Sequence, residues 1–495
     1  MHSHASAETD PANWLAALAR QHPDRLLLRT PDGQRVTCAA MNQRVDRVAA
    51  ALARRAVVAG DRVVAQVEKS PDAIALYLAC LRVGAAFVPL NTAYTSAEVE
   101  YFLGDADPKV AVGVAGGVSL AELTHDRPES ARPRADLQQS ELAALLYTSG
   151  TTGRSKGAML TRANLATNAL VLAQEWRFSE RDVLLHALPI FHVHGLFVAI
   201  NTVLASGSSM LFLPKFDADE VVRLLPEATV MMGVPTFYTR LLQHPAFTRE
   251  RCASIRLFVS GSAPLLAETH REFRARTGHA ILERYGMSET LMNTSNPYDG
   301  ERVPGSVGPS LPGVEVRIAD PESGVPLPAA GSVGMIEVRG PNVCRGYWRM
   351  PEKTAAEFRQ DGFFITGDVG RFDGNGYLFI VGRAKDLIIS GGYNVYPVEV
   401  ETELDALTGV AESAVIGVPH PDFGEGVTAV IVARAGATLD ETALRAALEQ
   451  RLANYKLPKR IVFVSEMPRN AMGKVQKAQL REHYRDLYNP ARDKH

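Results

Sequence analysis

The chain has 495 residues, of which 46% are hydrophobic and 22% are charged, so it is long enough for at least two globular domains. Its 53 Lys and Arg residues nearly balance its 55 Asp and Glu residues, and a net charge of −2 argues against a nucleic-acid-binding surface. No apolar run reaches the roughly 18 residues that a membrane-spanning helix needs, and residues 1–14 lack the basic start and apolar centre of a signal peptide.

The first half of the chain alternates strand-like and helix-like segments. Residues 62–67 read as a strand, 72–82 as a helix and 86–90 as a strand. This order predicts right-handed βαβ units around a largely parallel sheet. Thr95 and Glu98 have the spacing of a capping box that opens the next helix.

The pattern changes in the middle of the chain. Residues 228–235 and 255–264 are short apolar runs that end in turn residues, as buried parallel strands do. Between 307 and 382, short alternating runs separated by Gly and Pro predict an antiparallel or barrel-like structure instead. The overall fold class is therefore α/β, with α+β character towards the C-terminus.

The last part of the chain, about 110 residues long, is large enough to fold alone. Its expected elements are strands at 413–419, 428–434 and 460–466 and an amphipathic helix at 441–452. We therefore predict a large N-terminal domain, residues 1–384, and a small α+β C-terminal domain, residues 385–495. The cysteines are far apart and form no CxxC pair, which argues against disulfides or zinc and favours the cytoplasm: Cys38, Cys80, Cys252 and Cys344.

A glycine-rich segment, "LLYTSGTTGRSKGAM" (145–159), follows an apolar run and combines hydroxyl groups with two cations. Such a loop suits phosphate groups, although many loops of this composition bind nothing. It departs from the Walker pattern, because Ser155 and Gly157 stand where Gly and Ser or Thr are required. A P-loop kinase or ATPase is therefore not predicted.

The full string "YTSGTTGRSKG" resembles the phosphate-binding signature of the adenylate-forming enzymes, which include acyl-CoA synthetases, luciferases and adenylation domains. Further motifs resemble those of the same family and follow in its order: "SGSAP", "RYGMSET", "TGD", "GRAKD", "GGYNVYPVEVE" and "PRNAMGKVQK". The resemblance covers essentially the full length. It implies a large N-terminal domain of βαβ subdomains plus a small β-barrel, and a mobile C-terminal domain.

The resemblance implies that the chain binds ATP, Mg²⁺ and coenzyme A as a co-substrate. Hydroxyl and N–H groups of the loop would donate to the β- and γ-phosphates, while Glu289 is an oxygen ligand suited to Mg²⁺. The residues so assigned to the nucleotide are Thr148, Ser149, Gly150, Thr151, Thr152, Gly153, Lys156, Ser262, Tyr285, Gly286, Met287, Ser288, Asp368 and Arg383. Outside this family, Glu289 would read as a helix-start carboxylate, Tyr285 as a core residue and Asp368 as a turn residue.

The C-terminal motifs imply a catalytic lysine and a hinge. Lys474 would neutralise charge between an incoming carboxylate and the α-phosphate, whereas a lysine in such a polar stretch is ordinarily only solvated. Lys385 would be the hinge about which the C-terminal domain rotates between two half-reactions. Gly391 and Gly392 would then line the path of the coenzyme A thiol.

Two arginines point to the acid that is activated. Arg284 directly precedes "YGMSE", and Arg240 follows "GVPTFYT" in a segment that borders the acyl pocket in the family. A buried guanidinium needs an anionic partner, and a second carboxylate on the substrate is the simplest one. The surrounding strings resemble malonyl-CoA synthetases as a group, which implies malonate, with methylmalonate not distinguished.

Other interpretations of these residues stay open. Arg284 could pair with Glu283, Arg240 could be solvated, and packing is the commoner role for His192 and for His194. By resemblance, His192 and Ser262 would lie near the substrate carboxylate. The chain could also load a carrier protein or be a non-catalytic nucleotide-binding relative. The expected partners are small molecules, without nucleic acid or membrane, and the expected state is a monomer or a weak homo-oligomer.

Overall fold

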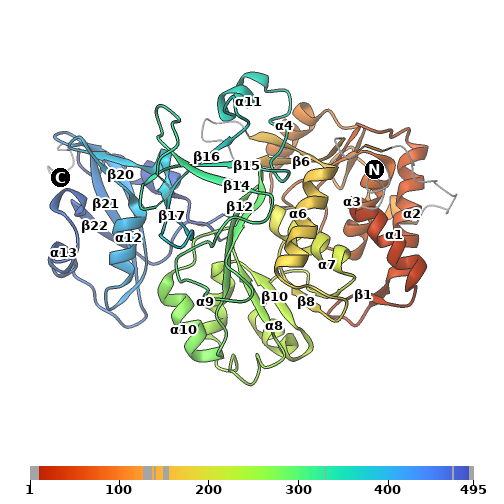
Figure 1. Ribbon diagram of the computed structural model, residues 1–495, viewed down its shortest axis with the longest axis horizontal. Coiled ribbons are helices and arrows are strands. Elements are labelled where there is room, and N and C mark those ends of the chain that lie inside the picture. The colour runs from red at the N-terminus through yellow and green to blue at the C-terminus, as the bar shows by residue number, and fades with distance from the viewer. Residues whose placement is uncertain are drawn as a thin grey trace.

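The computed structural model describes residues 10–125, 137–138, 141–148, 155–328, 330–470 and 473–489. The N-terminal helices lie at one end of the long axis in Figure 1, and the C-terminal elements (blue) lie at the other. Within the described residues, no helix is both long and apolar enough to cross a membrane.

A five-stranded sheet carries the phosphate-loop motif and has the order β5-β3-β4-β6-β7. Its strands are β3 (Arg62–Ala65), β4 (Ala86–Pro89), β5 (Val110–Val112), β6 (Leu142–Thr148) and β7 (Lys156–Thr161). The first four are parallel, and β7 is antiparallel to β6. The helices of this region are α2 (Cys38–Arg54), α3 (Pro71–Val83), α4 (Ser96–Ala106) and α5 (Leu120–Thr124). The predicted βαβ unit is thus confirmed by β3, α3 and β4, and Thr95 and Glu98 form the expected capping box.

An eight-stranded sheet has the order β13-β12-β11-β10-β8-β9-β1-β2. Its strands are β1 (Leu26–Arg29), β2 (Arg35–Thr37), β8 (Val183–His186), β9 (Ser209–Phe212), β10 (Val230–Gly233), β11 (Leu257–Ser260), β12 (Leu282–Met287) and β13 (Leu291–Ser295). Only the edge strands β2 and β13 are antiparallel to their neighbours. The carboxyl ends of β8, β10, β11 and β12 therefore meet at one edge, where open α/β sheets bind ligands.

Helices cover this sheet and connect its strands. They are α1 (Pro11–Gln21), α6 (Arg162–Glu175), α7 (Asn201–Ser206), α8 (Ala218–Leu224), α9 (Pro235–Gln243) and α10 (Ala267–Thr277), with a π-helix, η1 (His194–Ile200), and a 3₁₀ turn, η2 (Leu225–Glu227). Fully buried aliphatic and aromatic side chains fill the space between these helices and both sheets, so the two sheets share one core.

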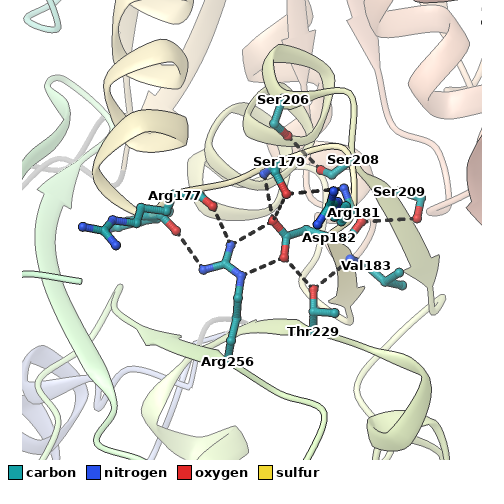
Figure 2. A network of polar contacts seen from close by, with 11 residues as sticks. Arg177, Ser179, Arg181, Asp182, Val183, Ser206, Ser208, Ser209, Thr229 and Arg256 are labelled. Carbon is teal, nitrogen blue, oxygen red and sulfur yellow. Dashed lines mark hydrogen bonds and ion pairs between the residues drawn. The ribbon is translucent and has the colours of Figure 1, made fainter. Parts of the chain in front are cut away.

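An arginine clasp fastens the opposite, amino-terminal edge of this sheet, as Figure 2 shows. The Arg256 guanidinium donates to both oxygens of the buried Asp182 carboxylate, at 2.7 and 2.9 Å, and to the carbonyl groups of Trp176 and Arg177. Thr229 donates to the same carboxylate at 2.8 Å. The segments before β8, β10 and β11 are thereby held together far from the ligand-binding edge.

The middle of the chain forms an antiparallel sheet with the order β14-β15-β16-β17, which confirms the predicted change of pattern. Its strands are β14 (Glu315–Ala319), β15 (Gly334–Arg339), β16 (Phe364–Phe372) and β17 (Leu378–Arg383), and helix α11 (Pro351–Glu357) precedes β16. A single bridge between Gly308 and Leu378 joins the edge strand β17 to the preceding chain. Asp368 lies inside β16, paired in register with Arg383.

The C-terminal part has its own five-stranded sheet and hydrophobic cluster. Its elements are β18 (Ile388–Ser390), β19 (Tyr393–Val395), α12 (Pro397–Asp405), β20 (Val410–His420), β21 (Gly424–Ala433), α13 (Glu441–Glu449), η4 (Asn454–Lys456), β22 (Arg460–Val464) and α14 (Lys477–His483). The predicted domain boundary at 384/385 falls in the short 3₁₀ turn η3 (Ala384–Asp386) between β17 and β18. Independent movement of the two parts stays a prediction.

Candidate active site

The described ends of the phosphate-loop motif lie in the antiparallel strands β6 and β7. Thr148 at the end of β6 pairs in register with Lys156 at the start of β7, so the two ends of the motif lie side by side. The Thr148 hydroxyl donates to Glu289 Oε1 at 3.3 Å, which joins two of the predicted nucleotide residues. The other loop residues of the prediction lie outside the described residues: Ser149, Gly150, Thr151, Thr152 and Gly153.

Glu289 is buried beside a polar cluster that the sequence did not reveal. The Tyr347 hydroxyl contacts Glu289 Oε1 at 3.2 Å and also contacts the carboxylate of Glu357. Burial raises the pKa of Glu289, while the hydroxyls of Tyr347 and Thr148 oppose that shift. A carboxylate held in this way gains from a nearby cation.

Lys156 contributes to the same cluster rather than projecting into solvent. Its Nζ lies 2.9 Å from Glu357 Oε1 and 4.8 Å from the centre of the Tyr347 ring. Lys353 pairs with the same Glu357 oxygen at 2.6 Å. Lys156, which the sequence assigned to phosphate, is therefore paired with Glu357, a residue 201 positions away in the sequence.

Tyr285, Asp368 and Arg383 meet in a second group of predicted nucleotide residues. The Tyr285 hydroxyl donates to Asp368 Oδ2 at 2.6 Å, and Arg383 Nε lies 2.9 Å from Asp368 Oδ1. Tyr285 and Asp368 are buried. The Asp368 carboxylate is thus fixed from both sides, which pre-orients the acceptor that the prediction assigns to ribose.

Gly286 and Met287 end β12, and Ser288 and Glu289 lie in the tight connection to β13. A Cβ atom on Gly286 would lie 1.8 Å from the carbonyl oxygen of Leu291, so only glycine permits this approach. This explains why a glycine stands between the predicted adenine-pocket residue Tyr285 and the predicted metal ligand Glu289.

Lys474 lies beside the Asp368 group, although it comes from the far end of the chain. Burial lowers its pKa to about 8, with the charges of Arg383 and Lys385 acting in the same direction and those of Asp368 and Asp386 opposing them. The structure thus brings Lys474 together with the predicted ribose residues and with the predicted hinge.

The segment before Lys474 packs on helix α9. A Cβ atom on Gly473 would lie 2.7 Å from Thr236 Oγ1, and the Lys474 N–H donates to Asn470 Oδ1 at 3.0 Å. An ion pair between Arg434 and Glu268 of α10, 2.9 Å long, adds a second contact with the N-terminal part. Lys474 is therefore held in place by backbone contacts as well as by charge.

Gly391 and Gly392 lie elsewhere, in the exposed turn between β18 and β19. Their φ values are +59° and +83°, so both adopt a conformation that glycine permits and other residues rarely do. Within the described chain, these glycines make no hydrogen bond with the Asp368 group. In this arrangement Lys474, rather than the glycine turn, occupies the site.

His192, His194 and Ser262 lie close together at the ligand-binding edge of the eight-stranded sheet. Ser262 Oγ lies 3.3 Å from His194 Nδ1, and the His194 N–H donates to His192 Nδ1 at 3.2 Å. Ser262 has a φ of +71°, a strained value for a residue with a side chain. Burial and the charge of Arg284 lower the pKa of His192 to about 4, so its imidazole is neutral near pH 7.

Arg284 is a buried cation without a neutralising partner. Its Nε and Nη2 atoms have no hydrogen-bonding partner in the part of the chain that the structure describes. Burial lowers its pKa to about 9, and the charges of Tyr238 and Glu283 oppose this shift only in part. The guanidinium lies against Gly261, where a Cβ atom would be only 2.3 Å from Cζ and Nη1.

Glu283 does not provide that partner. Successive residues of a strand point to opposite faces, and Glu283 Oε1 accepts from the Leu265 N–H at 3.1 Å instead. Burial raises the pKa of Glu283 to about 8, so near pH 7 this group is mostly neutral. The proposed internal pair with Arg284 is therefore absent among the described contacts.

Arg240 lies at a different place from the buried Arg284. It is exposed on α9 and lines a cavity of 380 Å³ that Thr236, Phe237 and Leu188 also line. Arg469, Asn470 and Gly473 close this cavity from the C-terminal side. Arg240 is thus positioned at the junction between α9 and the segment that leads to Lys474.

Comparison with known proteins gives matches along most of the chain. The profile of the family described as AMP-binding enzyme matches residues 15–348, and that of the AMP-binding enzyme C-terminal domain matches residues 399–474. A feruloyl-CoA synthase of Amycolatopsis sp. is 36% identical and covers 95% of this chain and 98% of its own length. The mitochondrial malonate–CoA ligase ACSF3 of Mus musculus is 38% identical, with coverages of 80% and 77%.

Solved structures agree with these matches. Crystalline ATP-bound MatB from Rhodopseudomonas palustris is 55% identical, covers 97% of this chain and 100% of its own, and superimposes with a TM-score of 0.92. The apo form of the same protein gives 0.81, so the present arrangement is more similar to the ATP-bound form. The chain is a member of the AMP-binding enzyme family.

Proposed function

We propose that this enzyme is an AMP-forming acid–thiol ligase that joins malonate to coenzyme A through an acyl-adenylate, releasing AMP and pyrophosphate. The observation that carries the choice of acid is the buried, unpartnered guanidinium of Arg284. An unpaired buried charge costs several kcal/mol, and a second carboxylate on the bound acid removes that cost by bidentate pairing. A monocarboxylic acid has no group to offer it.

The relatives support the same choice. Besides the mouse protein, a malonate–CoA ligase of Arabidopsis thaliana is 40% identical over 371 residues, covering 69% of this chain and 60% of its own. The feruloyl-CoA synthase activates an aromatic monocarboxylic acid by its name, and its likeness extends over more of the chain. Ferulate is therefore the informative alternative substrate to test.

The nucleotide binds, in this proposal, between the β6–β7 turn and the Tyr285–Asp368–Arg383 group. Asp368 accepts from ribose hydroxyls, and the loop that begins at Thr148 donates to the phosphates. Glu289 fits a Mg²⁺ ion that takes its other ligands from phosphates and water, since its carboxylate is buried and gains from a cation. Such an ion would neutralise phosphate charge and orient the phosphates for in-line attack.

In the first half-reaction, a malonate carboxylate oxygen attacks the α-phosphorus and displaces pyrophosphate. Lys474 places positive charge between two anions that otherwise repel each other. Neutral His192 and the Ser262 hydroxyl orient the attacking carboxylate, while Arg284 holds the other one. Arg240 supplies a further cation at the mouth of the pocket. Positioning and charge neutralisation carry this step.

In the second half-reaction, the coenzyme A thiol attacks the acyl carbon and AMP leaves. We propose that residues 385–495 rotate about Lys385 between the two steps, withdrawing Lys474 and bringing Gly391 and Gly392 to the site. The position of the glycine turn away from Asp368 in the present arrangement is consistent with the first step.

The decisive experiment is a panel of acids scored for ATP-dependent pyrophosphate release, with malonate, methylmalonate, succinate, propionate and ferulate at matched concentrations. We expect malonate to be the best substrate. Arg284→Gln should raise the malonate KM at least tenfold, equivalent to ~1.4 kcal/mol, and spare residual propionate use. Arg284→Lys should recover little, because lysine lacks the bidentate geometry.

A second variant leaves the arginine in place and moves it. Gly261→Ala introduces a Cβ atom 2.3 Å from Arg284 Cζ, so the guanidinium must shift, and the malonate KM should rise in the same way. Ferulate turnover that exceeds malonate turnover, or a malonate KM that does not respond to Arg284→Gln, would refute the dicarboxylate assignment.

We further propose a cytoplasmic enzyme that is a monomer or a weak homo-oligomer and acts on small molecules. The four cysteines are buried and free, which supports a reducing compartment. Analytical ultracentrifugation at micromolar concentration tests the oligomeric state, and a sharp dimer boundary at the lowest concentration would contradict it.

A further inference from the structure

A lysine outside the predicted site, Lys69, contacts His186, the residue that precedes the loop carrying His192 and His194. It lies in the connection between β3 and α3, and its Nζ is 2.9 Å from both Nδ1 and the carbonyl oxygen of His186. The same Nζ lies 4.4 Å from the centre of the Phe212 ring. No carboxylate forms an ion pair with Lys69 within the described chain, and burial lowers its pKa well below the usual value. Retaining a cation there needs a reason.

The contacts of His186 fix a single tautomer. Burial lowers the pKa of His186, so its ring is neutral and one of its nitrogens accepts while the other donates. The nitrogen that faces Lys69, Nδ1, is the acceptor. The other ring nitrogen, Nε2, lies 2.8 Å from the carbonyl oxygen of Gly195, which can only accept, so Nε2 carries the proton. The tautomer of His186 that donates to Gly195 is therefore the one that accepts from Lys69. We call these two hydrogen bonds the Lys69–His186–Gly195 relay.

The hydrogen bond between His186 and Gly195 closes the loop of residues 187–194 that lies between them. His186 ends β8, and Gly195 lies in the π-helix η1, an element that is often found at functional sites. A Cβ atom on Gly195 would lie 2.1 Å from the Pro189 carbonyl oxygen, so the loop folds back on itself as tightly as backbone allows. His186 holds this turn at its base.

The closed loop presents the acyl-pocket histidines. His192 and His194 lie on it, and His194 contacts Ser262 while the charge of Arg284 lowers the pKa of both rings. The anchor, Lys69, comes from the other sheet: it follows β3, which belongs to the same five-stranded sheet as the β6–β7 phosphate hairpin. Lys69 thus joins the phosphate-binding sheet to the acyl-binding sheet at the site itself.

We infer that Lys69 is a positioning residue of the acyl pocket, acting through His186 to hold His192 and His194 in register with Ser262 and Arg284. It does not touch the substrate in this inference. The inference rests on the proposed function, because it assigns the loop to the binding of the acid rather than of the nucleotide. Loss of Lys69 should therefore weaken the acid and leave ATP largely unaffected.

The test compares Lys69→Met, which keeps chain length and removes the donors, with Lys69→Arg, which keeps the charge and donors. Acid-dependent ATP–pyrophosphate exchange gives separate KM values for the acid and for ATP. We expect Lys69→Met to raise the malonate KM at least tenfold and to leave the ATP KM within twofold of wild type. The malonate KM of Lys69→Arg should be at least threefold lower than that of Lys69→Met. Arg82→Met is the matched control, since Arg82 is a buried cation of α3 that pairs with Asp46, away from His186.

A stability effect alone would look different. If Lys69→Met and Arg82→Met lower the melting temperature equally and leave the malonate KM within twofold of wild type, the lysine is only a structural contact and the inference is wrong. His186→Phe keeps the ring volume and covers the case in which Lys69→Met does not fold; it should raise the malonate KM tenfold, and an unchanged value overturns the inference.

A double variant and the wild-type acid preference separate the remaining explanations. The double variant Lys69→Met/His186→Phe should be no worse than the worse single variant, because both changes break one relay; multiplicative effects would show that Lys69 acts independently of His186. Wild-type enzyme that prefers another acid refutes the proposed function alone, and the same KM ratios are then measured with that acid, so the two failures are distinguished.

Discussion

The charge state of Lys474 should limit the first half-reaction at alkaline pH. Burial, together with Arg383 and Lys385, lowers its pKa to about 8 in the ligand-free enzyme. With that value, roughly 90% of Lys474 is protonated at pH 7 and roughly 10% at pH 9. Only the protonated form can neutralise charge between carboxylate and α-phosphate, and a charged donor of this kind contributes ~3–4 kcal/mol, or 10²–10³ in rate.

The sign and position of the effect follow from this pKa. Below pH 8 the ammonium is present, and above it kcat/KM for ATP should fall about tenfold per pH unit, since kcat/KM reports the free enzyme. The phosphates of bound ATP add negative charge beside Lys474 and stabilise the ammonium, so the decline of kcat itself should begin at higher pH. His192, with a pKa of about 4, should add no acid limb near neutrality.

The assay is malonate-dependent ATP–pyrophosphate exchange between pH 6 and pH 10 at constant ionic strength. Lys474→Arg is the matched control, because its guanidinium stays charged across this range. It should be slower than wild type, yet the alkaline limb near pH 8 should disappear. Persistence of the same limb in Lys474→Arg would show that another group titrates, and the reasoning from burial and neighbouring charge would be refuted.

Two further outcomes test the hinge and the clasp. Lys385→Pro should leave adenylate formation measurable by pyrophosphate exchange while malonyl-CoA formation drops sharply, because proline restricts the backbone rotation that the second step needs; equal loss of both activities would count against the hinge. Asp182→Asn should lower the free energy of unfolding in urea by about 3 kcal/mol, since it leaves the Arg256 charge without its partner. Burial raises the pKa of Asp182, but hydrogen bonds from Arg256 and Thr229 outweigh this and hold it below the usual value. The Asp182–Arg256 pair should therefore contribute its full stability above the usual aspartate pKa, and this contribution should be lost as the pH falls through the pKa of Asp182 in the folded protein. If Asp182→Asn and the wild type lose stability in the same way as the pH falls, this reasoning is wrong.

Local patterns in the sequence predicted most of the fold, because helices, strands and caps are determined largely by residues close together in the chain. The β3–α3–β4 unit and the Thr95–Glu98 capping box depend on residues a few positions apart, and each is present. Asp368 could equally have been a turn residue by local criteria, and only its pairing with Arg383 places it within β16. That pairing depends on the tertiary arrangement of two strands.

The parts of the site that the sequence did not reveal depend on contacts between distant residues. Glu357 meets Lys156 across 201 positions, and Lys69 meets His186 across 117. Arg284 shows the limit most clearly: its type and motif indicated an anionic ligand. Its burial, and the lack of a partner for Nε and Nη2 among the described residues, are properties of the folded chain. Neighbouring charges of opposite sign in a strand, Glu283 and Arg284, look like a pair in sequence and face opposite ways in the fold.

The contacts that hold Lys474 in the site are weak enough to permit the proposed movement of residues 385–495. The ion pair between Arg434 and Glu268 has about half of each side chain exposed, and exposed pairs of this kind contribute about 0–1 kcal/mol. The contact of Gly473 with Thr236 is small, and a glycine there buries no side chain. The charges around Lys474 are balanced against each other: Arg383 and Lys385 repel its ammonium group, while Asp368 and Asp386 attract it. We expect the anionic phosphates of ATP to add attraction for Lys474 when ATP binds, and the departure of pyrophosphate to remove part of that attraction. If residues 385–495 rotate after adenylation as proposed, we expect the loss of pyrophosphate to favour that movement, because it removes an attraction that opposes the repulsion by Arg383 and Lys385.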